Sequence, residues 1–201
     1  MNRRGRLVKG LVAGVVVAAG LSALFWLGFE RTIRVEGGYS NHPDDLGGET
    51  MWGVTEQVAR AWGYDGAMAA LPETTAAAIY HAGYWAPLRL DEVGAVYEDL
   101  ALLLFDVGFN VGTGRAAGWL QRCLNVNNGG GRRYGDVAVD GHIGPETLAA
   151  LGRYAELRGD AGEAMLLACV QGLQVTHYVA ISEARVQNET FTYGWLRRTT
   201  R

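Results

Sequence analysis

Two carboxylates and a hydroxyl lie close together in the first quarter of the chain. Asp45 follows Glu36 by nine residues, and Thr50 follows five residues later. Cleavage of a glycosidic bond needs an acid that protonates the leaving oxygen. It also needs a second group, on the opposite face of the sugar, that stabilises the cation or activates water. Three residues of these types therefore suggest a glycosidase, although Asp44 and Asp45 at such spacing also fit a plain turn.

The surroundings expected for the two carboxylates differ. We expect Glu36 at the end of a helix near Tyr39 and Trp52, where desolvation and the negative helix end raise the pKa of a carboxyl. Asp45 lies in a polar, glycine-flanked segment and is expected to stay ionised. Carboxyls in unlike environments divide acid and base roles. Thr50 can then orient the attacking water.

The elements that must position these residues are expected to be mainly helical. The segment before Glu36 predicts a helix that Gly37 and Gly38 end, and 39–55 predicts a loop or small hairpin. Thr55 is expected to cap the next helix. Further helices are expected from Pro72 toward Trp85, over Asp91–Phe109, over Arg115–Leu124, from Pro145, and over Glu163–Arg185, with an aromatic tail at 191–195.

Length and charge limit the classes of protein. The chain has 201 residues and 21.7 kDa, 49% of them hydrophobic and 19% charged, which suits one medium domain with a short appendage. Its 18 basic and 21 acidic residues give a net charge of −3. Without residues 1–29 the balance is 14 basic against 21 acidic, or −7. This acidic body argues against nucleic acid as a partner. Lys9 is the only lysine, which excludes a lysine-containing phosphate loop.

Twenty residues without a charge, Gly10–Phe29, follow a basic N-terminus. A helix of this length spans about 30 Å, the hydrocarbon core of a bilayer. The preceding arginines and Lys9 predict a cytoplasmic N-terminus and a periplasmic body. The run lacks a small-residue cleavage site, which favours an uncleaved anchor over a signal peptide. Nine of the twenty residues are Gly, Ala or Ser. Such a span can leave the bilayer, or its small residues can serve helix packing.

Neither cysteines nor histidines predict a metal site. Cys123 and Cys169 lack metal-ligand spacing, and the sequence leaves open whether they are buried thiols or one disulfide. Four histidines, His42, His81, His142 and His177, are scattered over different elements. We therefore expect no metal and no cofactor.

The string E-G-G-Y-S-N-x-P-x-D-x-G-G-x-T-x-x-G-V-T that starts at Glu36 resembles the signature of glycoside hydrolase family 108, a family of N-acetylmuramidases. Downstream, Tyr84-Trp85 and the segment 105–112 agree with that family. The segments 120–121, 140–148 and 191–198 resemble the peptidoglycan-binding region that follows in it. The resemblance covers about residues 31–198. Departures are His42, where an acidic residue is common, and Val54 in place of Ile.

The resemblance implies a lysozyme-like helical fold behind one N-terminal transmembrane helix. The expected regions are an anchor at 1–29, a catalytic region at 30–112 and a wall-binding region at 113–201, the last two packed as one unit. It implies Glu36 as the catalytic acid with Asp45 and Thr50 as its partners. The residues expected to contact substrate are Tyr39, Asn41, His42, Trp52, Asp106 and Asn110. For Asp106 and Asn110 the alternative is that they satisfy buried polar groups.

The weak anchor in front of a muramidase resembles the signal-arrest-release endolysins of phages, which lyse the host once they leave the inner membrane. We therefore expect a monomeric enzyme that binds peptidoglycan and, through residues 10–29, the membrane before it becomes soluble in the periplasm. A lytic transglycosylase, a non-catalytic wall-binding anchor and a host-encoded muramidase are the alternatives. Asp140, Gly141 and Pro145 fit turn and helix-start chemistry. The run 129–133 fits a mobile loop or, alternatively, a contact with anionic wall polymer.

Overall fold

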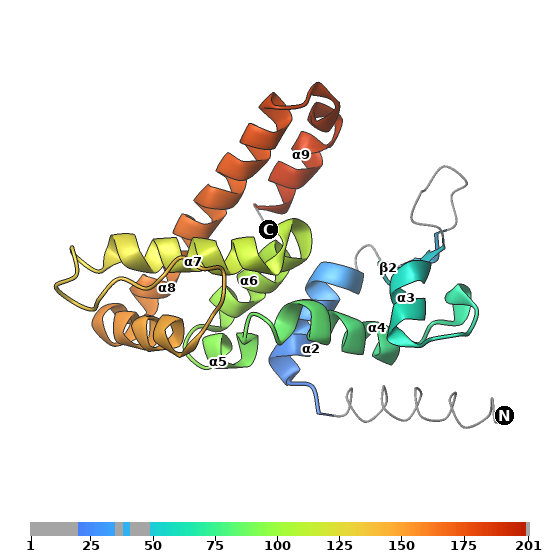
Figure 1. The fold of residues 1–201 in the computed structure, drawn as a ribbon, viewed down its shortest axis with the longest axis horizontal. Helices are drawn as coiled ribbons and strands as arrows, with labels where there is room; N and C mark the ends of the chain where they lie inside the picture. Colours follow the sequence, from blue (N-terminus) through green and yellow to red (C-terminus); the bar gives the residue numbers. More distant parts are fainter. Residues whose placement is uncertain (1–19, 35–37, 41–48, 200–201) are drawn as a thin grey trace. The chain divides into compact units, whose positions relative to one another are not determined.

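The computed structural model describes residues 20–34, 38–40 and 49–199 (Figure 1). The described chain is mainly helical, as expected. It divides into two compact units, Met1–Pro87 and Leu88–Arg201, and each is described by itself. The division falls inside the region 30–112.

The first unit is built on a short helix from the end of the expected membrane span. Helix α2, Ala23–Phe29, begins where the Ser22 hydroxyl accepts a hydrogen bond from the Phe25 amide at 3.1 Å, and it continues as a π-helical turn, η1, Glu30–Arg34. Phe25 and Phe29 are fully buried. Residues 10–19 of the expected span lie outside the described residues, whereas its last seven residues form a core helix of this unit.

Aromatic rings hold α2 against α4, Glu73–Tyr80, and the π-helical turn η3, His81–Trp85. The ring of Phe25 meets Trp85 edge-on, with centroids 5.3 Å apart, and the ring of Phe29 meets Tyr80 at 5.8 Å. Such edge-to-face pairs add to the free energy gained by burial. The remaining helices of the unit are α3, Glu56–Trp62, and the 3₁₀ turn η2, Met68–Ala70.

A small antiparallel hairpin precedes α3. Strands β1, Thr50–Met51, and β2, Val54–Thr55, pair in the register Thr50 to Thr55. The turn residues Trp52 and Gly53 both have positive φ, 55° and 71°, which is typical of the two-residue turn that matches strand twist. The Thr55 hydroxyl accepts a hydrogen bond from the Val58 amide at 3.4 Å. The predicted hairpin and the predicted Thr55 cap are therefore confirmed.

The second unit is helical throughout its regular elements. Helix α6 packs against α5, α7 and α8, and its core side chains include Leu100, Leu104 and Phe105. The elements are α5, Leu90–Gly94; α6, Glu98–Val111; α7, Thr113–Asn127; α8, Pro145–Glu183; η4, Val186–Asn188; and α9, Glu189–Arg198.

Of three expectations about these helices, two were wrong and one is confirmed. The helix expected over 91–109 is interrupted before Glu98, because Tyr97 is extended (φ −146°) and its hydroxyl reaches the Gly159 carbonyl at 2.7 Å. The two helices expected after Pro145 are both present within α8, and they meet at a kink at Gly159, where φ is +54°. The expected aromatic tail at 191–195 is part of helix α9, which packs against α8.

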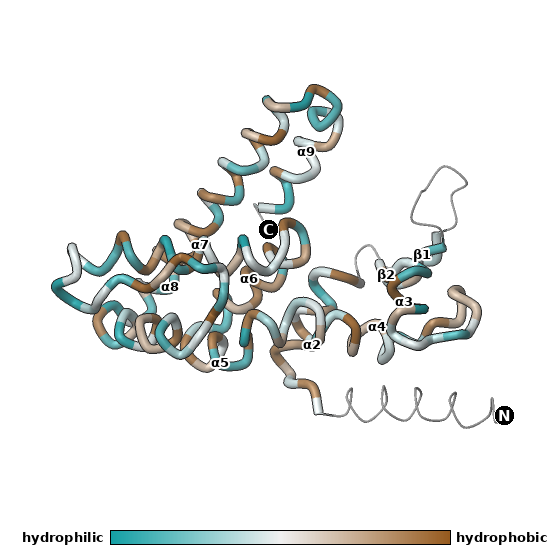
Figure 2. The backbone as a smooth tube through the Cα atoms, in the orientation of Figure 1, coloured by the Kyte–Doolittle hydropathy of each residue, from teal (hydrophilic) through white to brown (hydrophobic). Residues whose placement is uncertain are grey.

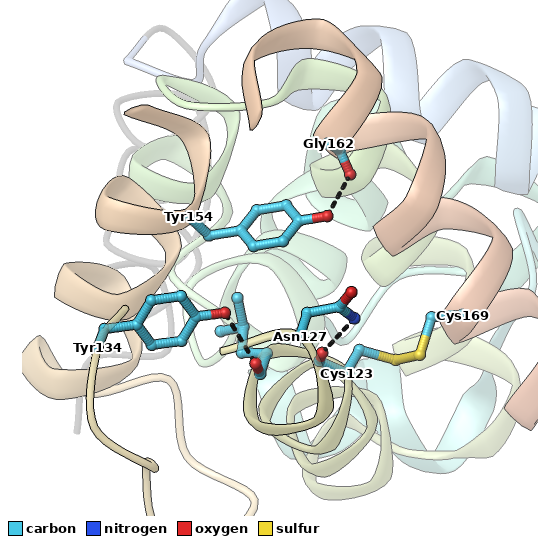
Figure 3. The surroundings of a disulfide bond; sticks show 7 residues. Cys123, Asn127, Tyr134, Tyr154, Gly162 and Cys169 are labelled. Carbon is cyan, nitrogen blue, oxygen red and sulfur yellow. Dashed lines mark hydrogen bonds between the residues drawn. A yellow bond between two sulfur atoms is a disulfide. The ribbon is translucent and has the colours of Figure 1, made fainter. Parts of the chain in front are cut away.

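The two cysteines form a disulfide, so the alternative of free thiols is not realised. Cys123 of α7 and Cys169 of α8 are joined with their Cα atoms 6.0 Å apart (Figure 3). Cys123 is fully buried. The bond fastens α7 to the part of α8 that follows the kink.

Hydropathy along the described chain points to one long apolar helix. Figure 2 shows apolar residues recurring along α8. Among the described residues, α8 is the one helix long and apolar enough to cross a membrane, by length and composition only. Core helices of soluble proteins have the same length and composition. Because the N-terminal span lies largely outside the described residues, it stays a prediction.

Candidate functional site

Thr50 lies where three stretches of backbone meet. As the first residue of β1 it pairs with Thr55 of β2, and on its other side it forms an isolated bridge with Ser40. The Ser40 amide donates to the Thr50 carbonyl at 2.9 Å, and the Thr50 amide donates to the Ser40 carbonyl at 2.8 Å. The chain thus leaves this ladder at Ser40 and re-enters it beside Thr50. The stretch that carries Asp45 connects these two neighbouring points.

Four of the predicted site residues, Glu36, Asn41, His42 and Asp45, lie outside the described residues. Glu36 is separated from η1 by one residue and precedes Ser40 by four. Tyr39, next to Ser40, is 46% exposed. Of the predicted residues in the first unit, the structure therefore brings Tyr39 and Thr50 together through the Ser40 bridge.

Trp52 is held by hydrogen bonds in an unusual backbone conformation. Its φ of 55° lies in the left-handed region, which is costly for a bulky residue and persists where neighbouring contacts hold it. Its indole nitrogen donates to the Leu71 carbonyl at 3.0 Å, and its own carbonyl accepts from the Tyr80 hydroxyl at 3.1 Å. The observed role of Trp52 is to fix the hairpin, and its contact with sugar stays a prediction.

Tyr80 is a supporting residue that sequence reasoning missed. Its side chain is 3% exposed, and its hydroxyl lies under the hairpin turn. A Cβ added to Gly53 would sit 2.6 Å from that hydroxyl oxygen. No local sequence pattern predicts this contact, because Trp52 and Tyr80 are 28 residues apart. Tyr80 therefore fixes the position of the turn that follows Thr50.

Asp106 and Asn110 lie on α6 of the second unit, one turn apart. The Asn110 amide donates to the Asp106 main-chain carbonyl at 2.7 Å. The Asp106 carboxylate is 3.8 Å from the Arg198 guanidinium of α9. Burial raises the pKa of the neighbouring Tyr178, the Asp106 charge adds to that rise, and a hydrogen bond from Gln174 and the Arg198 charge oppose it. The pair thus belongs to a polar cluster that joins α6, α8 and α9.

The Asp140 segment forms a rigid turn beside a cavity. The buried Gln121 donates to the Asp140 carboxylate at 2.8 Å and to the His142 carbonyl at 2.9 Å. The Gln121 hydrogen bond, followed by that of the His142 amide, lowers the pKa of Asp140. Pro145 is the first residue of α8, so the predicted turn and helix start are confirmed. The cavity, about 330 Å³, is lined by Gln121, Val137, Asp140, His142 and Thr147.

The described residues offer no candidate metal centre. No group of three or more His, Cys, Asp or Glu side chains is placed to hold an ion in that part of the chain. Burial, with help from the Arg115 charge, lowers the pKa of His177, which packs edge-on against Trp119 at 5.8 Å. His177 is thus a packed side chain of the second unit.

Comparison with protein families identifies two consecutive regions. Residues 29–112 match the model described as Glycosyl hydrolase 108, and residues 115–200 match the model described as Predicted Peptidoglycan domain. The stretch 29–112 is therefore a glycosyl hydrolase 108 region, and a peptidoglycan region follows it. The structure of Brucella abortus SagA is similar, with 26% sequence identity over 88% of this chain and 89% of that chain and a TM-score of 0.62. No curated protein matches this chain in sequence.

The glycosyl hydrolase 108 region identifies a glycoside hydrolase that acts on peptidoglycan. A substrate of that kind lies in the periplasm or outside the cell. Disulfides persist in such oxidising compartments, and the Cys123–Cys169 bond fits that setting.

Proposed function

We propose that this family 108 enzyme is a muramidase that hydrolyses the β-1,4 bond between N-acetylmuramic acid and N-acetylglucosamine. Glu36 protonates the leaving oxygen, Asp45 stabilises the cation or activates water, and Thr50 orients that water. The observation that carries the proposal is the Ser40–Thr50 bridge. It sets Thr50 beside the segment that follows Glu36, and it joins the two ends of the stretch that carries Asp45.

The support around Thr50 suits a catalytic group. Positioning must be accurate to a fraction of an ångström for a reacting water to be aligned. Backbone pairs with Ser40 and Thr55 fix Thr50 from both sides, and the Trp52 carbonyl is fastened to Tyr80. A hydroxyl on such a ladder keeps its place without help from the substrate.

We also propose that the enzyme is first held in the inner membrane by residues 10–29 and later released to lyse the host. The support is the burial of α2: Phe25 and Phe29 cannot lie in lipid and in the core of the first unit at the same time. Packing of α2 against Tyr80 and Trp85 supplies a favourable state outside the bilayer. Glu36 follows this helix by seven residues, so the position of α2 also sets that of the proposed acid.

The test is induced expression of Glu36→Gln in a Gram-negative host, with culture turbidity and the membrane and soluble fractions measured together. Loss of a general acid lowers the rate by at least about 10²-fold. We expect lysis by the wild type only, with uncleaved protein moving to the soluble fraction. The matched control is Glu56→Gln, an exposed carboxylate on α3 paired with Arg60 at 2.9 Å, and it should lyse normally.

Three results would contradict these assignments. Lysis by Glu36→Gln would remove Glu36 as the acid. Products that end in an anhydro-sugar instead of a reducing end would identify a lytic transglycosylase. Protein that stays in the membrane while cells lyse would refute release.

A further inference from the structure

The strongest unassigned feature of the second unit is a run of the chain that carries only positive charge. Between Asp106 and Asp136 the sequence has four arginines, Arg115, Arg122, Arg132 and Arg133, and no acidic residue. The unit as a whole has eleven arginines against thirteen acidic residues, so this bias is local. Two of the four arginines are adjacent and follow three glycines.

The glycine run is a defined turn. Gly129, Gly130 and Gly131 all have left-handed φ values, 72°, 71° and 76°. Asn128 anchors the turn: it is 1% exposed, its side-chain oxygen accepts from the Gly131 amide at 2.8 Å, and its side-chain nitrogen donates to Asp136. The backbone that presents Arg132 and Arg133 is thus fixed by a buried side chain, in contrast to the mobile loop expected from the sequence.

The two arginines of this turn keep most of their donors available. The Arg132 Nε donates to the Gly129 carbonyl at 2.9 Å, and one Arg133 Nη donates to the Asn127 carbonyl at 3.5 Å. A guanidinium has five N–H donors. Both side chains are exposed, and no carboxylate among the described residues lies within ion-pair distance of either.

A third arginine reaches the same place from α8. Figure 3 shows Tyr134, next to the turn, beside Tyr154 of α8. Their hydroxyls donate to the carbonyls of Leu124 at 2.8 Å and Gly162 at 3.1 Å. Arg158 follows Tyr154 by four residues and therefore shares its face of the helix.

Electrostatics agree with this placement. Burial, followed by the proximity of Tyr154, raises the pKa of Tyr134 to about 12, and the charges of Arg158 and Arg133 both oppose that rise. These effects agree with the position of Tyr134 beside Tyr154, one helical turn before Arg158. Arg158 also has no carboxylate within ion-pair distance among the described residues, and it is the last residue before the kink at Gly159.

We propose that Arg132, Arg133 and Arg158 form an arginine face that binds the free carboxylates of peptidoglycan stem peptides. This assignment rests on the proposed function, because it concerns how the enzyme holds its substrate. The guanidinium fork matches a carboxylate with two parallel hydrogen bonds. The sugar backbone of the wall carries no charge that would select arginine, whereas the stem peptides end in carboxylates.

Binding of a polyanion such as nucleic acid fits the arginine face less well. Nucleic acid binding draws on positive charge spread over a domain or along a helix. The arginine face has three cations on a unit whose net charge is −2. Three guanidinium groups, two on the turn and one at a helix end, match a few separated carboxylates better than a continuous phosphate chain.

The test is pelleting of the full chain in detergent with purified cell-wall sacculi, in a Glu36→Gln background so that the wall is not digested. The variant is R132Q/R133Q/R158Q. We expect about a tenfold loss of affinity at low salt, because each exposed ion pair adds only modestly to binding. We also expect a weaker dependence of affinity on salt than in the parent. Sacculi whose carboxylates are blocked as neutral amides should bind the parent and the variant equally.

The matched control is Arg153→Gln, which removes one arginine from the same half of α8. Arg153 is already paired with Glu156 at 2.6 Å, so its loss should leave pelleting unchanged. With Glu36 restored, the triple variant should cleave sacculi with blocked carboxylates at the parental rate, which shows that it is folded.

Several outcomes overturn the proposal. They are equal pelleting of parent and triple variant, equal loss in Arg153→Gln, undiminished parental binding to sacculi with blocked carboxylates, or displacement from sacculi by DNA at the same charge concentration as free stem peptide. Failure of the proposed function looks different: the Glu36→Gln background would still digest the wall, while the pelleting difference remained measurable at short times in the cold.

Discussion

At the scale of single residues, the hairpin that holds Thr50 depends on the space under its turn. Gly53 has a φ of 71°, and an added Cβ would lie 2.6 Å from the Tyr80 hydroxyl oxygen. Gly63, at the end of α3, has a φ of 97° and nothing within 4 Å of an added Cβ. Alanine substitutions at the two glycines therefore distinguish the cost of backbone strain from the cost of overlap with Tyr80.

We predict that Gly53→Ala lowers the free energy of unfolding of the first unit by about 1–3 kcal/mol more than Gly63→Ala. Left-handed backbone costs both variants roughly 1–2 kcal/mol, and overlap with Tyr80 adds about 1–3 kcal/mol in the first. Urea unfolding followed by tryptophan fluorescence measures the difference. Wall hydrolysis should also fall in Gly53→Ala, because Thr50 lies on the strand that leads into this turn. Equal destabilisation of the two variants would show that Tyr80 does not confine the turn.

At the scale of elements, the sequence predicted those features that depend on neighbouring residues. The Thr55 cap, the glycine-containing hairpin and Pro145 at the start of α8 follow from neighbouring residues alone. The break before Glu98 and the kink at Gly159 do not, because one hydrogen bond from Tyr97 joins points 62 residues apart. In the site, residue types suggested the chemistry but the spacing left a plain turn open. The roles of Glu36, Asp45 and Thr50 came from the family resemblance, and they stay predictions.

The disulfide is the covalent link between two elements of the second unit. Cys123 and Cys169 are 46 residues apart in sequence, and a closed loop of that length restricts the unfolded chain by about 4 kcal/mol in the loop-entropy account. We predict that C123S/C169S lowers the free energy of unfolding of the second unit by about 2–4 kcal/mol. Thermal unfolding with and without a reductant measures it: reductant should destabilise the parent and leave the double variant unchanged. No shift in either protein would mean that the disulfide does not stabilise α7 against α8.

At the scale of the whole molecule, the proposed release is a competition between two places for α2. Phe29 is fully buried in the first unit, whereas Leu27, two residues earlier on the same helix, is 38% exposed. Truncation of a buried Phe to Ala costs about 3–5 kcal/mol in a folded core. The same change in a membrane span costs only about 0.3–0.6 kcal/mol even at its centre.

Phe29→Ala should therefore shift the balance toward the membrane by about 3 kcal/mol, which corresponds to more than a hundredfold in the ratio of released to inserted protein. Leu27→Ala is the matched control, because it removes a similar apolar side chain from the span but little buried surface from the unit. We predict that Phe29→Ala accumulates in the membrane fraction and delays lysis, while Leu27→Ala partitions and lyses like the wild type. If both variants partition alike, the packing of α2 is not what draws the enzyme out of the bilayer, and release must depend on residues before Gly20.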